Sequence, residues 1–304
     1  MITVGIPHAL LFHKYQDLWI NFFKELNIKT IISNKSNKDT LANGSNYAQD
    51  EACLSLKIYL GHVSELVNKV DYILVPRIVS LKKYEKLCTN FSLLYDLVNN
   101  TFKTKILNYN IDVTKKHSEE QAFINLGLEL GKSQNETKKA YRIAKEKQRI
   151  ELNKKIKEQM ISLKSHSPKI LLVGHPYNLY DELIGIPIIN YLKSNNITPI
   201  FADIYDDIKI DYECNKISSS IYWTYNKELM GAISHYKDHV DGIILITTFP
   251  CGPDSLCNEM ITKKVNNIPM ISLIIDELNN TAGIITRLES FIDIINMKRG
   301  IIHG

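Results

Sequence analysis

Gly-Ile-Ile-Leu-Ile-Thr-Thr-Phe-Pro-Cys-Gly-Pro-Asp-Ser-Leu-Cys-Asn-Glu-Met, residues 242–260, is the stretch that decides the fold. Its apolar run, residues 243–246, is typical of a strand that is buried on both faces. Two prolines and a glycine follow within residues 249–253 and predict a stiff turn without regular structure. Asp254 or Ser255 then favours a helix start, because short polar side chains cap helix N-termini. Strand, turn and helix in this order indicate an α/β fold.

Cys251 lies in that turn, just beyond the predicted strand. Open α/β sheets bind their ligands at the carboxyl ends of their strands. A nearby helix N-terminus also favours the thiolate, which is the form of cysteine that binds metal. The alternative is a small buried cysteine that only packs in the turn. The turn alone leaves both interpretations open.

The composition describes an ordinary globular protein. The chain has 304 residues, of which 44% are hydrophobic and 23% charged, and a formal net charge of +4. This length allows one large domain or two modest ones. The charge comes from lysines spread over polar segments, so it predicts no nucleic-acid surface.

The opening residues lack the features of a signal peptide, and no apolar run reaches the ~18 residues of a membrane span. We therefore expect a cytoplasmic protein without a membrane partner. Its five cysteines are then expected to be reduced thiols.

An internal repeat defines the predicted architecture. Residues 4–8, Val-Gly-Ile-Pro-His, align with residues 173–177, Val-Gly-His-Pro-Tyr, and a second match pairs 70–75 with 240–245. A strand–proline–helix–strand unit thus occurs twice, which predicts two Rossmann-like, three-layer α/β lobes with parallel sheets.

The segment between the repeats is charged and helical in pattern, and its mixed signs indicate a solvated helix face. We predict an N-terminal α/β lobe at 1–114, a helical connector at 115–167 and a C-terminal α/β lobe at 168–304.

Facing lobes of this kind would bring the carboxyl ends of their strands to a shared cleft. His175 lies at one strand end, where an acid–base role and loop packing compete equally. Asp276 and Glu277 follow another strand, and adjacent carboxylates usually point apart, so at most one is expected to act. These three residues are the candidate catalytic groups. No glycine-rich phosphate loop is present.

A site that used Cys53, Cys88 and Cys251 would straddle such a cleft, whereas Cys214 and Cys257 are interpreted as incidental. Three thiolates with one open position suit an iron–sulfur cluster. Structural zinc prefers four closed ligands and would need a histidine such as His62 or His175 in addition. Sequence spacing alone leaves the metal open.

The motifs together resemble the 2-hydroxyacyl-CoA dehydratase and benzoyl-CoA reductase superfamily, in its activase-related uncharacterised branch. The resemblance covers nearly the whole chain, and its motifs are 6–11, 51–57 with 61–63, 75–77, 174–177, 249–254 and 276–289.

This resemblance implies a [4Fe-4S] cluster held by Cys53, Cys88 and Cys251, with one iron open to substrate or solvent. It also implies an ATP-hydrolysing activase as electron donor and an acyl-CoA as substrate. A second copy of the chain is a further candidate partner. Relatives often have proline where this chain has Ser55 and Thr89. A non-catalytic electron-transfer or cluster-carrying protein, and a metal-free cleft-binding module, are the alternative functions.

Overall fold

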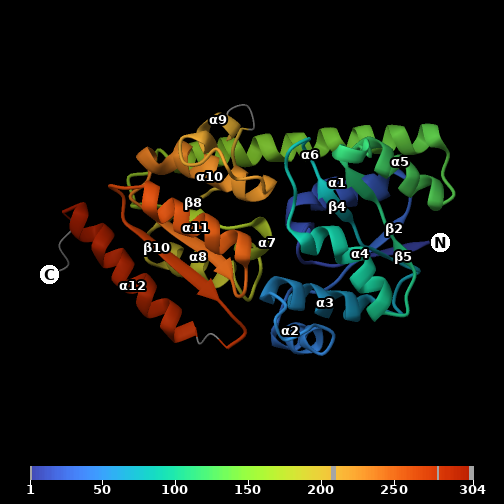
Figure 1. Ribbon diagram of the computed structural model, residues 1–304, viewed down its shortest axis with the longest axis horizontal. Helices are drawn as coiled ribbons and strands as arrows, with labels where there is room; N and C mark the ends of the chain where they lie inside the picture. Colours follow the sequence, from blue (N-terminus) through green and yellow to red (C-terminus); the bar gives the residue numbers. More distant parts are fainter. Residues whose placement is uncertain (1, 207–209, 279–280, 301–304) are drawn as a thin grey trace. The chain divides into compact units, whose positions relative to one another are not determined.

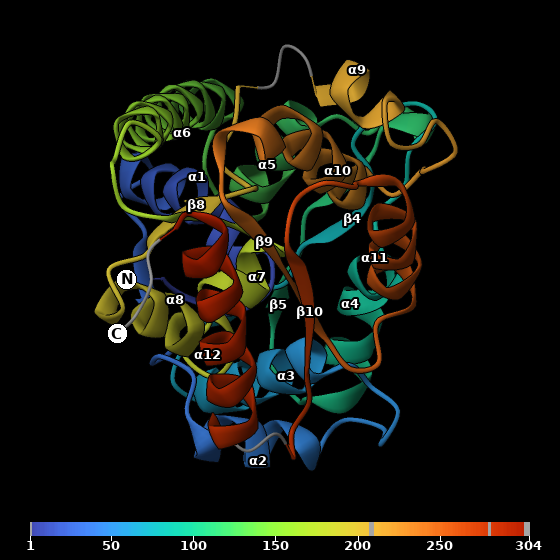
Figure 2. The same ribbon diagram turned by 90° about the vertical axis from the view of Figure 1, so that its left-hand side faces the viewer.

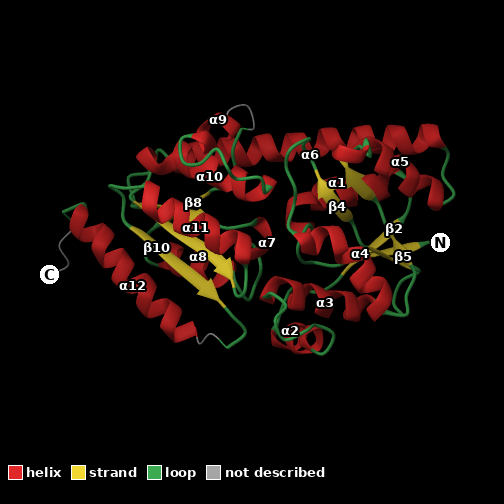
Figure 3. Cartoon of the chain, viewed as in Figure 1, coloured by secondary structure: helices red, strands yellow, loops and turns green. Residues whose placement is uncertain are grey.

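The computed structural model describes residues 2–206, 210–278 and 281–300. The chain packs as two compact units. Unit 1 comprises residues 1–153 and 222–224, and unit 2 comprises residues 154–221 and 225–304. Figure 1 shows the chain with its elements labelled, and Figure 3 shows that helices and short strands alternate along it.

Unit 1 contains a four-stranded sheet in the order β2-β1-β3-β5, with every neighbouring pair parallel. Helix α1 lies on one side of this sheet and α2 and α3 lie on the other (Figure 1). The bounds of these elements are β1 Thr3–Ile6, α1 Phe12–Glu25, β2 Lys29–Ile32, α2 Lys38–Ser45, α3 Leu54–Leu66, β3 Tyr72–Leu74, α4 Thr89–Thr101 and β5 Ile106–Leu107.

Pro76 interrupts the ladder of unit 1, because proline has no amide hydrogen to donate. The chain continues beyond it as β4, Arg77–Ser80, which pairs in parallel with β6, Asn110–Asp112. Arg77, which directly follows Pro76, therefore belongs to a strand and not to a loop.

Aromatic side chains form the core of unit 1. The indole Nε1 of Trp19 donates to the hydroxyl of Tyr109 at 2.9 Å, and both rings are buried. Phe123, on helix α5 (Glu119–Glu129), packs edge-to-face on Phe22 of α1, with ring centroids 4.8 Å apart. Buried aromatic surface of this size is a large share of the stabilisation of a small unit. The 3₁₀ turn η1, Val113–Lys115, precedes α5.

Unit 2 contains a second four-stranded parallel sheet, in the order β10-β9-β7-β8. Helices α8 and α12 lie on one side of β9 and β10 and α11 lies on the other, as Figure 2 shows. All seven residues of β9 are buried, as the apolar run predicted. The bounds are β7 Lys169–Val173, α7 Pro176–Leu179, α8 Gly185–Ser194, β8 Thr198–Phe201, α9 Ile210–Asn215, α10 Thr224–Tyr236, η3 Lys237–His239, β9 Gly242–Thr248, α11 Gly252–Lys264, β10 Met270–Ile275 and α12 Thr281–Lys298.

The two sheets share one topology, which confirms the predicted mixed α/β fold with parallel sheets. Numbered within each unit, both sheets have the strand order 2-1-3-4. The sequence match of residues 4–8 with 173–177, however, differs by three residues from the correspondence that the strand pairing gives. Lys29 pairs with Thr3, and its counterpart Thr198 pairs with Lys169, so Thr3 corresponds to Lys169 and Val4 to Ile170, not to Val173.

Helix α6, Gln134–Ser162, begins in unit 1 and ends in unit 2. In unit 1 its Lys147 pairs with Glu25 of α1 at 2.7 Å. In unit 2 its buried Gln159 hydrogen-bonds the backbone of Phe201 and Ile204. Among the described helices, none combines the length and the apolar character that crossing a membrane requires.

Candidate functional site

Cys251 is the N-cap residue of helix α11. Gly252 and Pro253 form the first turn, where proline is tolerated because its missing amide hydrogen would have no helical partner. The prediction that Asp254 or Ser255 caps this helix is therefore wrong. The helix begins earlier, and Asp254 is its third residue. The preceding peptide bond, between Phe249 and Pro250, is cis.

Asp254 turns inward and accepts three hydrogen bonds. Its Oδ1 accepts from His175 Nε2 at 2.8 Å and from Asn226 Nδ2 at 2.7 Å, while its Oδ2 accepts from Thr247 Oγ1 at 2.9 Å. His175 follows β7, Thr247 belongs to β9 and Asn226 to α10. Neighbouring strands β7 and β9 thus bring His175 and Thr247 to the same end of the sheet, beside the start of α11. We call these four residues the His175–Asp254 network.

The electrostatics of the network favour an ionised Asp254. Burial opposes ionisation of this carboxyl, but the electrostatic attraction of His175 and the hydrogen bonds from His175, Asn226 and Thr247 outweigh it and lower its pKa to about 2. A buried carboxylate with several donors of this kind is well compensated. Asp254 is therefore an acceptor of hydrogen bonds at neutral pH.

Asp276 and Glu277 follow β10, at the same end of the unit 2 sheet. The Oδ1 of Asp276 accepts from the amide of Leu278 at 2.8 Å, which closes a local turn. Asp276 is half-buried, and Glu277 is exposed. Nearby, Arg287 on α12 donates from Nη2 to the carbonyl of Ser272 at 2.6 Å.

Cys53 and Cys88 lie in unit 1, and each is the N-cap residue of a helix. Cys53 precedes α3 and Cys88 precedes α4, and these two helices contact each other. The side chain of Asn90, in the first turn of α4, donates from Nδ2 to the sulfur of Cys53 at 3.6 Å. The fold of unit 1 thus brings both helix starts, each with its thiol, into one neighbourhood. Their caps have extended backbone and no side-chain cap hydrogen bond.

Ser55 and Thr89 occupy the second and first positions of α3 and α4. These are the helix positions that accept proline best. Pro253 has the same place in α11 that Ser55 has in α3, two residues after the N-cap cysteine. Helices α3 and α4 thus begin directly after Cys53 and Cys88 without a proline.

The other two cysteines are deeply buried in unit 2. Cys214 is fully buried and lies near Cys257, which is 3% exposed. Burial, with the charges of Asp254 and Cys214, raises the pKa of the Cys257 thiol to about 12. A thiol of this kind stays protonated and does not ligate metal readily. None of the five cysteines forms a disulfide.

His62, a candidate zinc ligand, has both ring nitrogens occupied. Its Nδ1 and Nε2 each lie 2.9 Å from a hydroxyl, that of Ser33 and that of Ser36 respectively. The ring is fully buried. Within the described ranges, no group of three or more histidine, cysteine, aspartate or glutamate side chains is placed to hold a metal ion.

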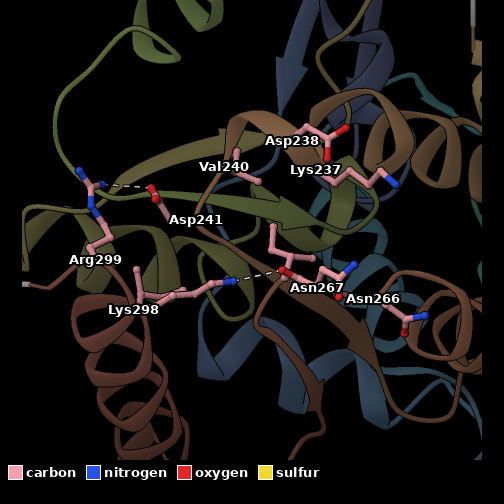
Figure 4. Close-up of a pocket in the computed structure, with 10 residues that line it drawn as sticks. Lys237, Asp238, Val240, Asp241, Asn266, Asn267, Lys298 and Arg299 are labelled. Atoms are coloured by element: carbon pink, nitrogen blue, oxygen red, sulfur yellow. Dashed lines mark hydrogen bonds and ion pairs between the residues drawn. The ribbon is translucent and has the colours of Figure 1, made fainter.

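A surface hollow lies at the opposite end of the unit 2 sheet, where β9 begins (Figure 4). Two basic side chains that line it have partners within the hollow. Arg299 contacts Asp241 at 3.1 Å, and Lys298 donates to the carbonyl of Asn267 at 3.1 Å. Because open α/β sheets bind ligands at their carboxyl ends, this hollow is not the candidate site.

The structure adds functional candidates that the sequence did not single out: Asn226, Thr247, Asn90, and Asp254 in a new role. Polar residues within apolar stretches of the sequence could have identified some of these candidates. Thr247 lies in an otherwise apolar strand, and Asp254 lies three residues after a turn cysteine.

The fold and these residues define a class of protein with two topologically equivalent α/β units and a cysteine at the N-terminus of a helix in each. The match to a known family is more specific. Residues 3–204 match the CoA enzyme activase uncharacterised domain, and the chain belongs to this family. This agrees with the resemblance to the activase-related branch of the 2-hydroxyacyl-CoA dehydratase superfamily. No curated protein matches the chain.

Proposed function

We propose that this chain is an iron–sulfur protein that binds one [4Fe-4S] cluster through Cys53, Cys88 and Cys251. It would receive low-potential electrons from an ATP-dependent activase and use them in reductive chemistry on a small acyl-CoA. Membership of the family of the CoA enzyme activase uncharacterised domain supports this proposal.

One observation carries the proposal. Each of the three cysteines is the N-cap residue of a 13-residue helix. Amide hydrogens without helical partners, and the positive end of the helix dipole, stabilise negative charge at this position. Thiolates carrying a cluster are such a charge. The buried Cys214 and Cys257 lack this setting, which supports Cys53, Cys88 and Cys251 as the proposed ligands.

When bound, a cluster of this type supplies single electrons at low potential. The protein's own residues have separate tasks. The thiolates hold the group, the amide of Asn90 donates to the sulfur of Cys53, and the His175–Asp254 network offers a buried imidazole for handling a proton. Such hydrogen bonds to sulfur tune the potential of a cluster.

The test is anaerobic purification followed by iron and acid-labile sulfide analysis and electron paramagnetic resonance of the reduced protein. We expect equal amounts of iron and sulfide in the wild type, a severe loss in Cys251→Ser, and no loss in the matched control Cys214→Ser. A protein that stays free of iron after reconstitution would sink the proposal. Electron transfer from an activase with ATP, with and without acyl-CoA, then separates an enzyme from a non-catalytic electron carrier.

A further inference from the structure

His175 has a buried imidazole ring in which one nitrogen is hydrogen-bonded and the other is not. Its side chain is 5% exposed, and its Nε2 lies 2.8 Å from Asp254 Oδ1. Among the described residues, its Nδ1 has no hydrogen-bond partner although the atom is buried. A buried polar atom without a partner is costly, so it needs an explanation.

The tautomer of His175 follows from its neighbour. An ionised carboxylate can only accept hydrogen bonds, so the hydrogen between the two groups belongs to Nε2 of His175. A neutral imidazole carries one N–H, and its Nδ1 therefore presents a lone pair. Protonation of Nδ1 as well would leave a buried donor without an acceptor.

Asn226 and Thr247 fix this arrangement. Their donors lie 2.7 Å and 2.9 Å from the two oxygens of Asp254, so the carboxylate cannot turn away from the imidazole. Asn226 belongs to α10 and Thr247 to β9, so the carboxylate is held by residues of two regular elements in unit 2. A carboxylate that orients an imidazole in this way is a recurrent device of proton-handling sites.

Aromatic rings flank the imidazole. The ring of Tyr177 stacks on it at a centroid distance of 4.9 Å, and that of Tyr225 lies edge-on at 6.2 Å. Tyr225 is buried and Tyr177 is half-buried. Because Tyr177 covers one face of the imidazole and the Nδ1 lone pair lies in the plane of the ring, we expect a ligand to reach Nδ1 along the ring plane.

We propose that His175 is a proton acceptor whose Nδ1 binds an O–H group of the ligand, and that Asp254, Asn226 and Thr247 are the positioning residues that hold it in this tautomer. Nδ1 would accept a hydrogen bond from the ligand O–H, and on transfer the proton would move to Nδ1 while the electron pair of the O–H bond stays on the ligand oxygen as an alkoxide. The imidazolium would be stabilised by the Asp254 carboxylate, which stays ionised. This proposal extends the proposed function and depends on it only for the choice of an acyl-CoA as the ligand.

The first experiment measures the tautomer directly. Long-range ¹H–¹⁵N correlation spectra of metal-free protein with ¹⁵N-labelled histidine distinguish a protonated from an unprotonated ring nitrogen. We expect His175 to carry hydrogen on Nε2 alone at neutral pH. In Asp254→Asn, the new amide can donate to Nε2, so we expect the hydrogen to shift toward Nδ1.

Two controls accompany this measurement. His62, which is held by hydroxyls, should be unchanged in every variant, and Asp203→Asn, which alters a carboxylate bound to Tyr180, should leave His175 unchanged. Hydrogen on Nδ1 in the wild type overturns the proposal without any variant, so it stays testable even where Asp254→Asn does not fold. An unchanged tautomer in folded Asp254→Asn overturns the role of Asp254.

The second experiment identifies the ligand group. Titration with 2-hydroxybutyryl-CoA and, separately, butyryl-CoA should shift the Nδ1 resonance only with the hydroxy ester. Equal shifts with both esters overturn the hydroxyl assignment and indicate a water molecule as the donor. Failure of both esters to bind removes acyl-CoA from the proposed function, while the tautomer of His175 is decided by the first experiment.

Discussion

His62 and His175 show how position decides what a buried histidine does. Two serine hydroxyls occupy both nitrogens of His62, so its ring is a completed part of the core of unit 1. Asp254 occupies one nitrogen of His175 and leaves the other buried and open. The sequence identified His175 as a candidate because it lies at a strand end. It could not identify Asp254 as its partner, because the two are 79 residues apart.

The buried histidines of unit 1 make its stability depend on pH. Burial, with the nearby His8 and His62, lowers the pKa of His13 to about 3, and burial with His8 lowers that of His62 to about 3. Both stay neutral in the folded state while the unfolded state takes up protons below its pKa of about 6.5. The free energy of unfolding should therefore fall as the pH drops from 6.5 toward 3, by up to about 1.4 kcal/mol per pH unit for each histidine.

Urea unfolding at several pH values, followed by tryptophan fluorescence, measures this effect. Both tryptophans, Trp19 and Trp223, belong to unit 1, so the signal reports the unit that holds the two histidines. His62→Gln should flatten the slope, and the exposed His166→Gln should not. A slope that is the same in His62→Gln and in the wild type contradicts the assignment.

At the scale of elements, the sequence predicted most helices and strands of both sheets but not where some of them begin. The helix after Cys251 starts at Gly252, because glycine and proline are both compatible with a first turn, whereas the sequence pattern favoured a polar cap. Helix α2 forms in a largely polar segment. The capping box of Asn37 and Thr40 explains why a polar segment becomes a helix here.

Helices α2 and α3 cross at two glycines, and this contact supports the helix that begins after Cys53. A Cβ on Gly44 would overlap the backbone carbonyl of Lys57, and one on Gly61 would overlap that of Thr40. Backbone atoms cannot yield as a flexible side chain can. We expect Gly44→Ala to lower the free energy of unfolding by about 1–3 kcal/mol or more.

Gly283, in helix α12, is the matched control. No atom lies within 4 Å of the Cβ that alanine would add there. Alanine should therefore stabilise that helix by about 0.5–1 kcal/mol, since glycine is the poorer helix former. Thermal unfolding of both variants gives the comparison, and a neutral Gly44→Ala would show that the two helices can separate at little cost.

For the whole molecule, the repeat predicted that one sheet topology occurs twice, and the strand orders confirm it. The three-residue shift between the first strands was not readable from sequence. The match rested on a shared glycine and proline, but hydrogen-bond register is set by the neighbouring strands, which pair Thr3 with Lys29 and Lys169 with Thr198. The three cysteines were candidates from their predicted positions, but it was the family resemblance, and not their spacing, that implied them as one ligand set.

Helix α6 belongs to both units, and Gln159 is its anchor in unit 2. Its side chain donates to the carbonyls of Phe201 and Ile204, at 2.9 Å and 2.8 Å, and accepts from the amide of Phe201 at 2.8 Å. Gln159→Ala would leave these backbone groups, at the end of edge strand β8, without their partner. We expect a loss of about 2–3 kcal/mol in the free energy of unfolding of unit 2, at roughly 1 kcal/mol for each hydrogen bond.

Urea unfolding followed by two spectroscopic signals shows which unit loses stability. Far-UV circular dichroism reports both units, and tryptophan fluorescence reports unit 1 alone. Because the hydrogen bonds of Gln159 all lie in unit 2, we expect its replacement to shift the circular dichroism transition more than the fluorescence transition. Replacement of the exposed Lys155 by alanine should shift neither. Equal shifts in both signals would mean that the continuous helix makes the two units unfold as one cooperative body.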